Sequence, residues 1–118
     1  MPHKLPNYLR TFRKRTGLSQ DEVAFLLGCQ SGAKVSRYER LSRKPNLETA
    51  LAYEVLFGAA GRDLFAGIFQ KVEERTKKRA QLLTGKLAEE RQDRMTAAKI
   101  KALQVIASGP TVELSKNS

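Results

Sequence analysis

The chain has 118 residues, of which 41% are hydrophobic, and this predicts one compact domain with a modest core and room for an appended helical element. Its 22 Lys and Arg residues against 12 Asp and Glu residues give a formal charge of +10, which favours a polyanionic partner such as nucleic acid or a membrane surface. A single cysteine, Cys29, and a single histidine, His3, exclude an intrachain disulfide and a metal site built from these residue types. No apolar run is long enough to span a bilayer and the N-terminus lacks the apolar core of a signal peptide, so we expect a cytoplasmic protein.

The N-terminal part of the chain predicts an arm followed by a first helix. Residues 1–7 include two prolines and are expected to lack regular structure. Residues 8–15 are predicted to form a helix that packs Leu9 and Phe12 inward and that Gly17 ends. The short connection after this glycine makes the first two helices neighbours in space.

The stretch from Ser19 to Arg40 predicts two short helices hinged at a glycine, which is the pattern of a helix-turn-helix. Ser19 and Glu22 have the spacing of a capping box, and Gly28 can take the left-handed conformation that ends a helix. Ser31 can cap the second helix. The expected apolar stripe of the first helix is Val23, Leu26 and Leu27, and the second helix places Val35, Tyr38 and Glu39 on one side and Ala33, Arg37 and Arg40 on the other.

A fourth helix is predicted over residues 47–57, with Asn46 as its cap and Gly58 at its end, and residues 59–65 predict a fifth, short helix. The apolar positions of the fourth helix, at spacings of three or four, are Leu47, Leu51, Val55 and Leu56. The predicted core of the five helices is Leu9, Phe12, Leu18, Ala24, Leu27, Val35, Tyr38, Leu51 and Leu56.

From Gly67 onward the pattern predicts a long helix that continues to about residue 94. Its apolar seam is narrow, because Arg79 stands where an apolar residue is wanted and Gly85 costs roughly 1 kcal/mol relative to Ala inside a helix. The charges of this region alternate in sign along the chain, which is typical of a solvated helix face. Thr96 can cap a last helix, which we expect to fold back on the long one, and a mobile tail is expected from about residue 110.

Four motifs follow one another between about Leu9 and Phe65: LR-x-x-R, GLSQ-x-E-x-A-x-x-LG, VSRYER and KP-x-LE-x-A. In order and spacing they resemble the lambda-repressor and Cro type of helix-turn-helix transcriptional regulator, the XRE family. The resemblance implies an all-α fold with a five-helix lambda-repressor-like DNA-binding domain at residues 1–66. The pattern beyond it adds a long helix and a helical hairpin extension at residues 67–118. One residue is inserted between Gly28 and Val35 relative to the family's pattern, at the start of the expected recognition helix.

Individual residues can be assigned to DNA contacts. Arg37 lies on the outer side of the expected recognition helix, where it can pair with O6 and N7 of guanine; the alternative is that it contacts only phosphate or a surface carboxylate. By resemblance to the family, Ala33 and Lys34 also face bases, and Arg13 and Glu39 form an internal ion pair. Phosphate contacts are expected from Ser19, Gln20, Arg40, Arg43 and Lys44, although a basic loop such as 40–44 can also serve only solubility.

One recognition helix contacts too few base pairs to select a site in a genome, so we expect a homodimer on an inverted-repeat operator with half-sites roughly 34 Å apart. The candidate dimer interface lies on the C-terminal helices and comprises Phe69, Val72, Thr76, Leu83, Leu87, Ile100, Leu103 and Ile106. The alternative is that these stripes pack on each other within one chain, which would bury the same residues.

We find no catalytic constellation, so the sequence predicts no enzyme, no cofactor, no small-molecule ligand and no membrane partner. The expected function is a sequence-specific double-stranded DNA-binding regulator that acts as a repressor by occupying its operator. An alternative is a protein-interaction module, such as an antitoxin-like or assembly partner, that binds through its C-terminal helices. RNA binding is a third possibility.

Overall fold

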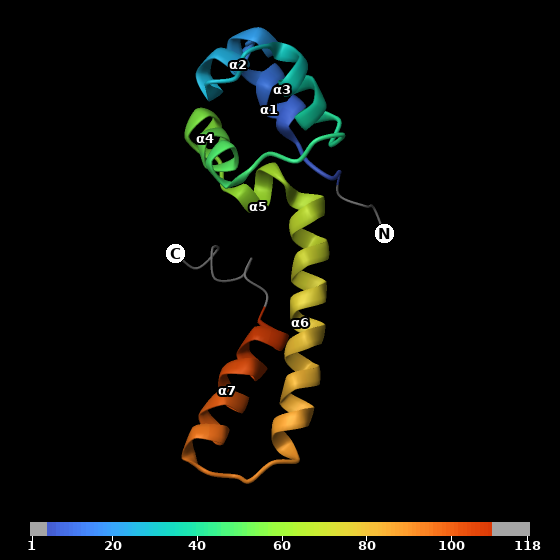
Figure 1. The fold of residues 1–118 in the computed structure, drawn as a ribbon, viewed down its shortest axis with the longest axis vertical. Coiled ribbons are helices and arrows are strands. Elements are labelled where there is room, and N and C mark those ends of the chain that lie inside the picture. The colour runs from blue at the N-terminus through green and yellow to red at the C-terminus, as the bar shows by residue number, and fades with distance from the viewer. Residues whose placement is uncertain (1–4, 110–118) are drawn as a thin grey trace. The chain divides into compact units, whose positions relative to one another are not determined.

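The computed structural model describes residues 5–109, and over this range it is helical without strands (Figure 1), which confirms the predicted all-α fold. The predicted tail from about residue 110 lies outside the described residues. The helices are α1 (Leu9–Thr16), α2 (Gln20–Leu27), α3 (Gly32–Glu39), α4 (Leu47–Phe57), α5 (Gly61–Leu64), α6 (Ala66–Ala88) and α7 (Arg94–Ser108). The described residues divide into two compact units, 5–70 and 71–109, and the division falls within α6.

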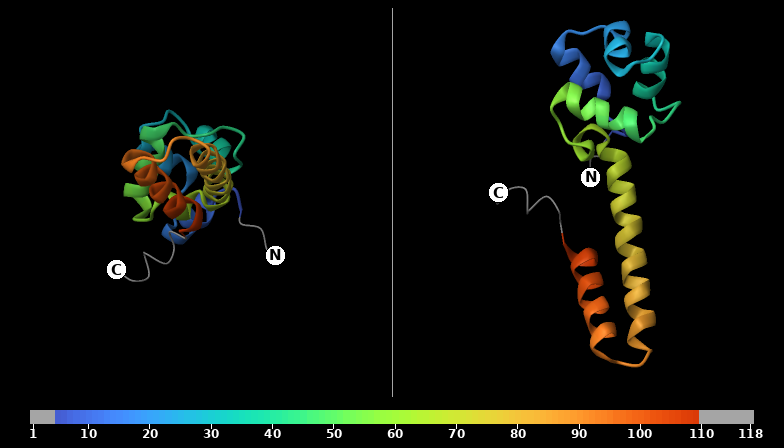
Figure 2. Two further views of the ribbon diagram at one scale, coloured as in Figure 1. Left: turned by 90° about the horizontal axis from the view of Figure 1, so that it is seen from below. Right: turned by 60° about the vertical axis from the view of Figure 1, so that its left-hand side comes forward.

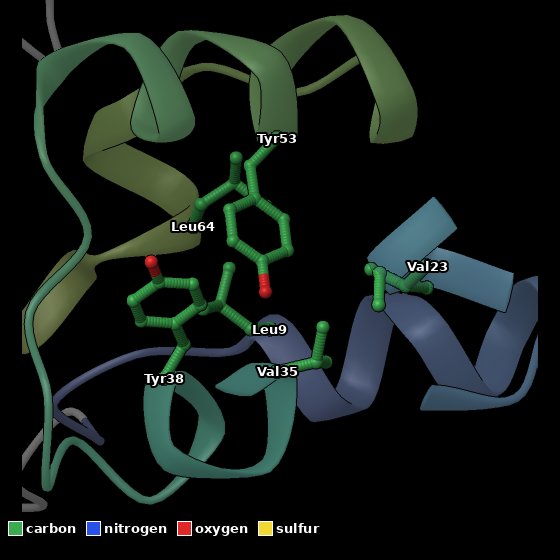
Figure 3. Close-up of a cluster of buried hydrophobic side chains, with 7 residues drawn as sticks. Leu9, Val23, Val35, Tyr38, Tyr53 and Leu64 are labelled. Atoms are coloured by element: carbon green, nitrogen blue, oxygen red, sulfur yellow. The ribbon is translucent and has the colours of Figure 1, made fainter. Parts of the chain in front are cut away.

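The core of the first unit is a cluster of buried side chains contributed by α1 to α5 (Figure 3). Tyr53 of α4 reaches into the middle of it, and its ring meets the ring of Tyr38 edge-on at a centroid distance of 6.3 Å. The cluster consists of Leu9, Val23, Ala24, Val35, Tyr38, Tyr53 and Leu64. Because one cluster holds residues from all five helices, α2 and α3 are packed on a common support.

The apolar row predicted to bury α4 faces solvent instead. Leu47, Leu51 and Val55 are 74%, 48% and 85% exposed, so the assignment of Leu51 to the core was wrong, whereas Leu56 of the same predicted row does pack against the core. The helix is buried through Tyr53, Leu56 and Phe57, and the rings of Tyr53 and Phe57 stack at 5.8 Å. The reason is that α4 carries two rows at helical spacing, and the row with the larger aromatic rings fills the space between the helices. On α2, Leu26 is likewise 53% exposed, whereas Val23 is fully buried.

Residues 5–7 lack regular structure, as the sequence predicted, and they are anchored to the first unit. Asn7 is buried; its side-chain amide donates to the carbonyl of Tyr38 (3.0 Å), and its Oδ1 accepts from the amide of Leu9 (3.1 Å). The amide of Gly67 in the first turn of α6 donates to the carbonyl of Leu5 at 2.9 Å. A Cβ at Gly67 would lie 2.8 Å from the backbone carbon of Leu5, so this close approach requires glycine.

In the second unit, α7 runs antiparallel to α6, which confirms the predicted hairpin (Figures 1 and 2). Ala80 and Leu87 of α6 and Thr96 of α7 are buried, and Ile100 and Leu103 are half-buried. α6 ends at Ala88 rather than near residue 94. The predicted cap of α7 was wrong: Asp93 is the cap, because its Oδ1 accepts from the amide of Thr96 at 2.8 Å, and this hydrogen bond lowers the pKa of Asp93.

No helix in residues 5–109 is long and apolar enough to cross a membrane. Within the same residues, no three His, Cys, Asp or Glu side chains are grouped so that they could hold a metal ion.

Candidate nucleic-acid interface

The first helix of the helix-turn-helix, α2, begins with the capping box that the sequence predicted. The hydroxyl of Ser19 accepts from the amide of Glu22 (3.0 Å), and the amide of Ser19 donates to Oε1 of Glu22 (2.8 Å). At its other end Gly28 has a φ of 78°, a left-handed conformation that residues with a Cβ rarely adopt. Both ends of α2 are therefore fixed by local interactions.

The start of α3 is capped from α2 rather than by its own N-cap residue. Oδ1 of Asp21 accepts a hydrogen bond from the amide of Gly32 at 2.9 Å. Ser31 occupies the N-cap position as predicted, but its side chain makes no cap hydrogen bond, so that part of the prediction was wrong. The helix termini come close because residue 32 is glycine: a Cβ there would lie 2.5 Å from Oδ1 of Asp21 and 3.0 Å from its backbone nitrogen.

The turn between α2 and α3 comprises residues 28–31, within the segment from Gly28 to Val35 where the sequence has one residue more than the family's pattern. After this turn, Val35 and Tyr38 are 0% and 3% exposed, as the sequence predicted. Because these two side chains set the rotation of α3 about its axis, the opposite side of the helix keeps its predicted composition. Ala33, Arg37 and Arg40 are all exposed on that side.

The exposed side of α3 is basic and free of ion pairs. Neither Arg37 nor Arg40 forms a salt bridge with any carboxylate in the part of the chain that the structure describes. Lys34 is half-buried and lies about 100° around the helix axis from Ala33, so it flanks the face that Ala33 and Arg37 share. Ser36, which the sequence analysis did not select, is half-exposed beside Arg40, and its carbonyl accepts from Nε of Arg40 at 3.3 Å.

Three of the five predicted phosphate residues lie around one open cleft between α1, the start of α2 and α3. The residues that line it are Arg10, Arg13, Ser19, Gln20, Ser36, Glu39 and Arg40. The cleft thus brings together Ser19, Gln20 and Arg40, and it adds Arg10, which sequence reasoning missed. Arg10 lies one turn before Arg13 on α1, and this spacing was the signal that could have identified it.

The predicted ion pair is present and holds the three helices around this cleft. Nε of Arg13 lies 2.6 Å from Oε2 of Glu39, and the two side chains are only 12% and 5% exposed. Oε1 of Glu39 accepts a second bond from Arg13 (3.2 Å) and one from Nε2 of Gln20 (3.1 Å). The hydrogen bond with Glu39 raises the pKa of Arg13 further. One carboxylate therefore joins α1, α2 and α3, and Gln20 keeps one amide hydrogen for another acceptor.

The remaining predicted phosphate residues lie in the loop after α3. Arg43 and Lys44 are exposed and do not line the cleft. The loop folds back on the end of the helix, because the amides of Ser42 and Arg43 both donate to the carbonyl of Arg37, at 3.0 and 3.3 Å. Leu41 takes a positive φ of 58° at this reversal. The loop therefore begins at a defined position next to the backbone carbonyl of Arg37.

Comparison with known proteins agrees with this geometry. The sequence profile of a family described as a helix-turn-helix domain matches residues 5–66, which is more than half of the chain. The chain therefore belongs to this helix-turn-helix family, and the match is consistent with the resemblance to the lambda-repressor and Cro type. A helix-turn-helix domain indicates a DNA-binding regulator. No curated protein and no solved structure matched the chain.

Proposed function

We propose that the protein is a sequence-specific double-stranded DNA-binding regulator of the lambda-repressor and Cro type. The observation that carries the proposal is the exposed side of α3, where Ala33, Arg37 and Arg40 face solvent on a helix held in the core by Val35 and Tyr38. An α-helix fits the major groove of B-DNA, where each base pair presents a distinct pattern of donors and acceptors. A rigidly held helix with free guanidinium groups suits direct readout of those patterns.

Within this proposal, Arg37 is the principal base-reading residue. Its guanidinium group has no intramolecular ion pair in residues 5–109 and can donate two hydrogen bonds to O6 and N7 of one guanine. Ala33 lies one turn earlier and offers its methyl group to thymine. Lys34 reaches a base or a phosphate from the flank of the same face.

Phosphate contacts set the register of the complex and supply much of its affinity. Ser19, Gln20 and Arg40 would contact one phosphate group at the cleft, together with Arg10, and the N-terminal amides of α2 add a partial positive charge there. Arg43 and Lys44 would contact a flanking phosphate from the loop. Residues 1–44 carry ten Lys and Arg against three Asp and Glu residues, which suits a polyanionic ligand of this part of the chain.

The regulator would act as a cytoplasmic, non-enzymatic repressor that occupies an operator. It would bind as a homodimer, because two recognition helices related by a twofold axis read an inverted repeat. Of the eight candidate interface residues, Leu87 is buried inside the hairpin, whereas Val72, Thr76, Leu83 and Ile106 remain exposed. These four residues are the dimer surface that we propose.

A second candidate is a protein-interaction module that binds another protein through the C-terminal helices. It is favoured by the apolar residues that the hairpin leaves exposed, including Leu82, Met95 and Val105, which are 63%, 66% and 65% exposed. Exposed apolar residues in such numbers fit a surface that a partner covers.

The test of DNA recognition is selection of bound sequences from a random duplex pool, repeated with Arg37→Ala and Arg43→Ala. We expect the wild type to enrich one sequence motif. Arg37→Ala should lose about 1 to 3 kcal/mol of preference at one base position, whereas Arg43→Ala should weaken binding to all sequences alike. An equal, sequence-independent loss in both variants would make Arg37 a phosphate residue. A wild-type protein that enriches no duplex would favour the interaction module.

The test of the dimer is sedimentation equilibrium of the full chain at micromolar concentration. We expect a dimer that the double variant Leu83→Glu/Ile106→Glu converts to a monomer, because two charges would be buried at the interface. Leu82→Glu introduces the same type of charge at an exposed site outside the proposed surface and should leave the dimer intact. A monomeric wild type would contradict the dimer proposal.

A further inference from the structure

Five of the six positively charged residues of α6 lie on one side of the helix, although the charges of this region alternate in sign along the sequence. Successive residues of an α-helix are rotated by about 100°, which places five basic residues within an arc of roughly 100°. These residues, which we call the basic stripe, are Lys71, Arg75, Lys78, Arg79 and Lys86. All five are exposed.

The basic stripe lies on the side of α6 that is turned away from α7. Ala80 and Leu87, the buried residues of this part of α6, lie roughly opposite to the stripe on the helix circumference. Packing of the hairpin therefore leaves the stripe uncovered within the second unit, and α6 presents its apolar side to α7.

Negative charges do little to neutralise the stripe. Glu73 points to another side of the helix, where its carboxylate pairs with Lys77 at 3.4 Å. Glu74 borders the stripe four residues before Lys78, yet in the described part of the chain none of the five basic residues forms a salt bridge. The stripe thus consists of five unpaired positive charges in a row.

The dimensions of the stripe suit the backbone of a nucleic acid duplex. From Lys71 to Lys86 the helix rises about 22 Å, which matches the length of roughly six base pairs of B-DNA. Such a duplex segment carries one negative charge per about 1.7 Å of its axis, so every basic residue of the stripe can find a phosphate.

We propose that the basic stripe is a second binding surface for the sugar–phosphate backbone of duplex DNA, in addition to the recognition helix. It binds without base selection, and it adds affinity and salt dependence but no sequence preference. The choice of duplex DNA as the ligand rests on the function proposed above.

A membrane surface is the other polyanion to consider, and the composition of the stripe argues against it. A helix that binds in the plane of a bilayer buries an apolar face next to its basic residues. Leu82 is the one apolar residue within the arc of the five basic ones. Ala80 and Leu87 on the opposite side are buried, and the exposed Val72 and Leu83 at the border of the stripe belong to the surface that we propose for the dimer.

The experiment measures binding of the full chain to a non-specific duplex of about 40 base pairs as a function of salt concentration. The triple variant Arg75→Gln/Lys78→Gln/Arg79→Gln removes three charges from the stripe. The control Arg91→Gln/Lys99→Gln/Lys101→Gln removes three exposed charges from the same unit outside it. We expect the stripe variant to lower the slope of log affinity against log salt by about two to three units, and the control to lower it by less than about one.

Equal slopes in the two variants would overturn the proposal. Circular dichroism checks that both variants are folded, and Lys71→Gln/Lys86→Gln, at the two ends of the stripe, provides a second variant with an expected loss of about one to two units. If the stripe variant lost binding to vesicles containing phosphatidylserine but bound the duplex as the wild type does, the stripe would be assigned to membranes and the proposal would be overturned as well. Failure of the proposed function has a different signature: the wild type would show no preferred duplex sequence, whatever the stripe variant does to the salt slope.

Discussion

Oδ1 of Asp21 on α2 accepts a hydrogen bond from the amide of Gly32 at the start of α3, with a length of 2.9 Å. The two helices of the helix-turn-helix are thus joined by a side-chain cap that crosses from one to the other. The free amides at a helix N-terminus need acceptors, and a carboxylate there also interacts favourably with the helix dipole. This contact sets where the proposed recognition helix begins.

Asp21→Ala should therefore lower the free energy of unfolding by about 0.5 to 2 kcal/mol, the usual cost of losing an N-terminal cap. Asp21→Asn keeps an acceptor oxygen and should retain most of the stability. Gly32→Ala should also destabilise the protein, because its Cβ would lie 3.0 Å from the backbone nitrogen of Asp21 and 3.1 Å from the backbone carbon of Gln20, and would displace the capping carboxylate of Asp21. Urea denaturation followed by circular dichroism measures all three variants, and a Gly32→Ala variant as stable as the wild type would contradict the close approach.

The ion pair between Arg13 and Glu39 should contribute more to stability than any exposed charge. Glu39→Ala leaves the guanidinium group of Arg13 largely buried without its partner, which typically costs about 3 to 5 kcal/mol. Glu48→Ala removes an exposed carboxylate and is the control. Thermal denaturation compares them, and an unchanged melting temperature in Glu39→Ala would remove the structural role of the pair.

Tyr53→Phe should be as stable as the wild type or more stable by up to about 1 kcal/mol. The Tyr53 hydroxyl is buried and lacks a hydrogen-bond partner within the described residues, so its removal relieves a desolvation cost. A clear loss of stability in a urea titration at neutral pH would mean that the hydroxyl has a partner.

The same tyrosine should make the protein sensitive to alkali. Burial, and then the negative charge of Glu39, raise the pKa of Tyr53 above its ordinary value of 10.0. The unfolded chain releases this proton at lower pH than the folded chain, so the stability present below about pH 10 should decline above it. Tyr53→Phe should show a smaller decline between about pH 10 and 12. The measurement is the free energy of unfolding of both proteins as a function of pH. If the two curves were parallel between about pH 10 and 12, the raised pKa of Tyr53 would be contradicted.

Leu51 tests whether its side of α4 faces solvent, and Leu64 of α5 is the buried reference. Leu64 is fully buried in the core beside α4, and Leu64→Ala should cost about 2 to 5 kcal/mol. Leu51 is 48% exposed, and Leu51→Ala should cost less than about 1 kcal/mol. If the two substitutions were equally destabilising in urea denaturation, the row of Leu47, Leu51 and Val55 would be covered in solution.

The features that could be predicted from the sequence depend on residues close together in the chain. The Ser19 and Glu22 capping box, the glycine end of α2 and the Asn46 cap of α4 each involve residues within a few positions of one another. The family's motif spacing also placed Arg13 opposite Glu39, although the pair is 26 residues apart. Local hydrogen bonding and a familiar pattern were sufficient for these elements.

Other features depended on contacts between distant residues, which periodicity does not reveal. On α4 two rows had helical spacing, and the aromatic rings of Tyr38 and Phe65, which meet Tyr53, decided that Tyr53 faces inward while Leu51 faces solvent. The cap of α3 came from Asp21, eleven residues earlier, because the turn brings Gly32 against the start of α2. Likewise, the sequence of α6 showed alternating charges, and only the direction in which α7 packs on it separated a covered side from an exposed basic one. Hydrophobic burial is non-directional, so which of several possible faces is buried is determined by the other helices available to cover it.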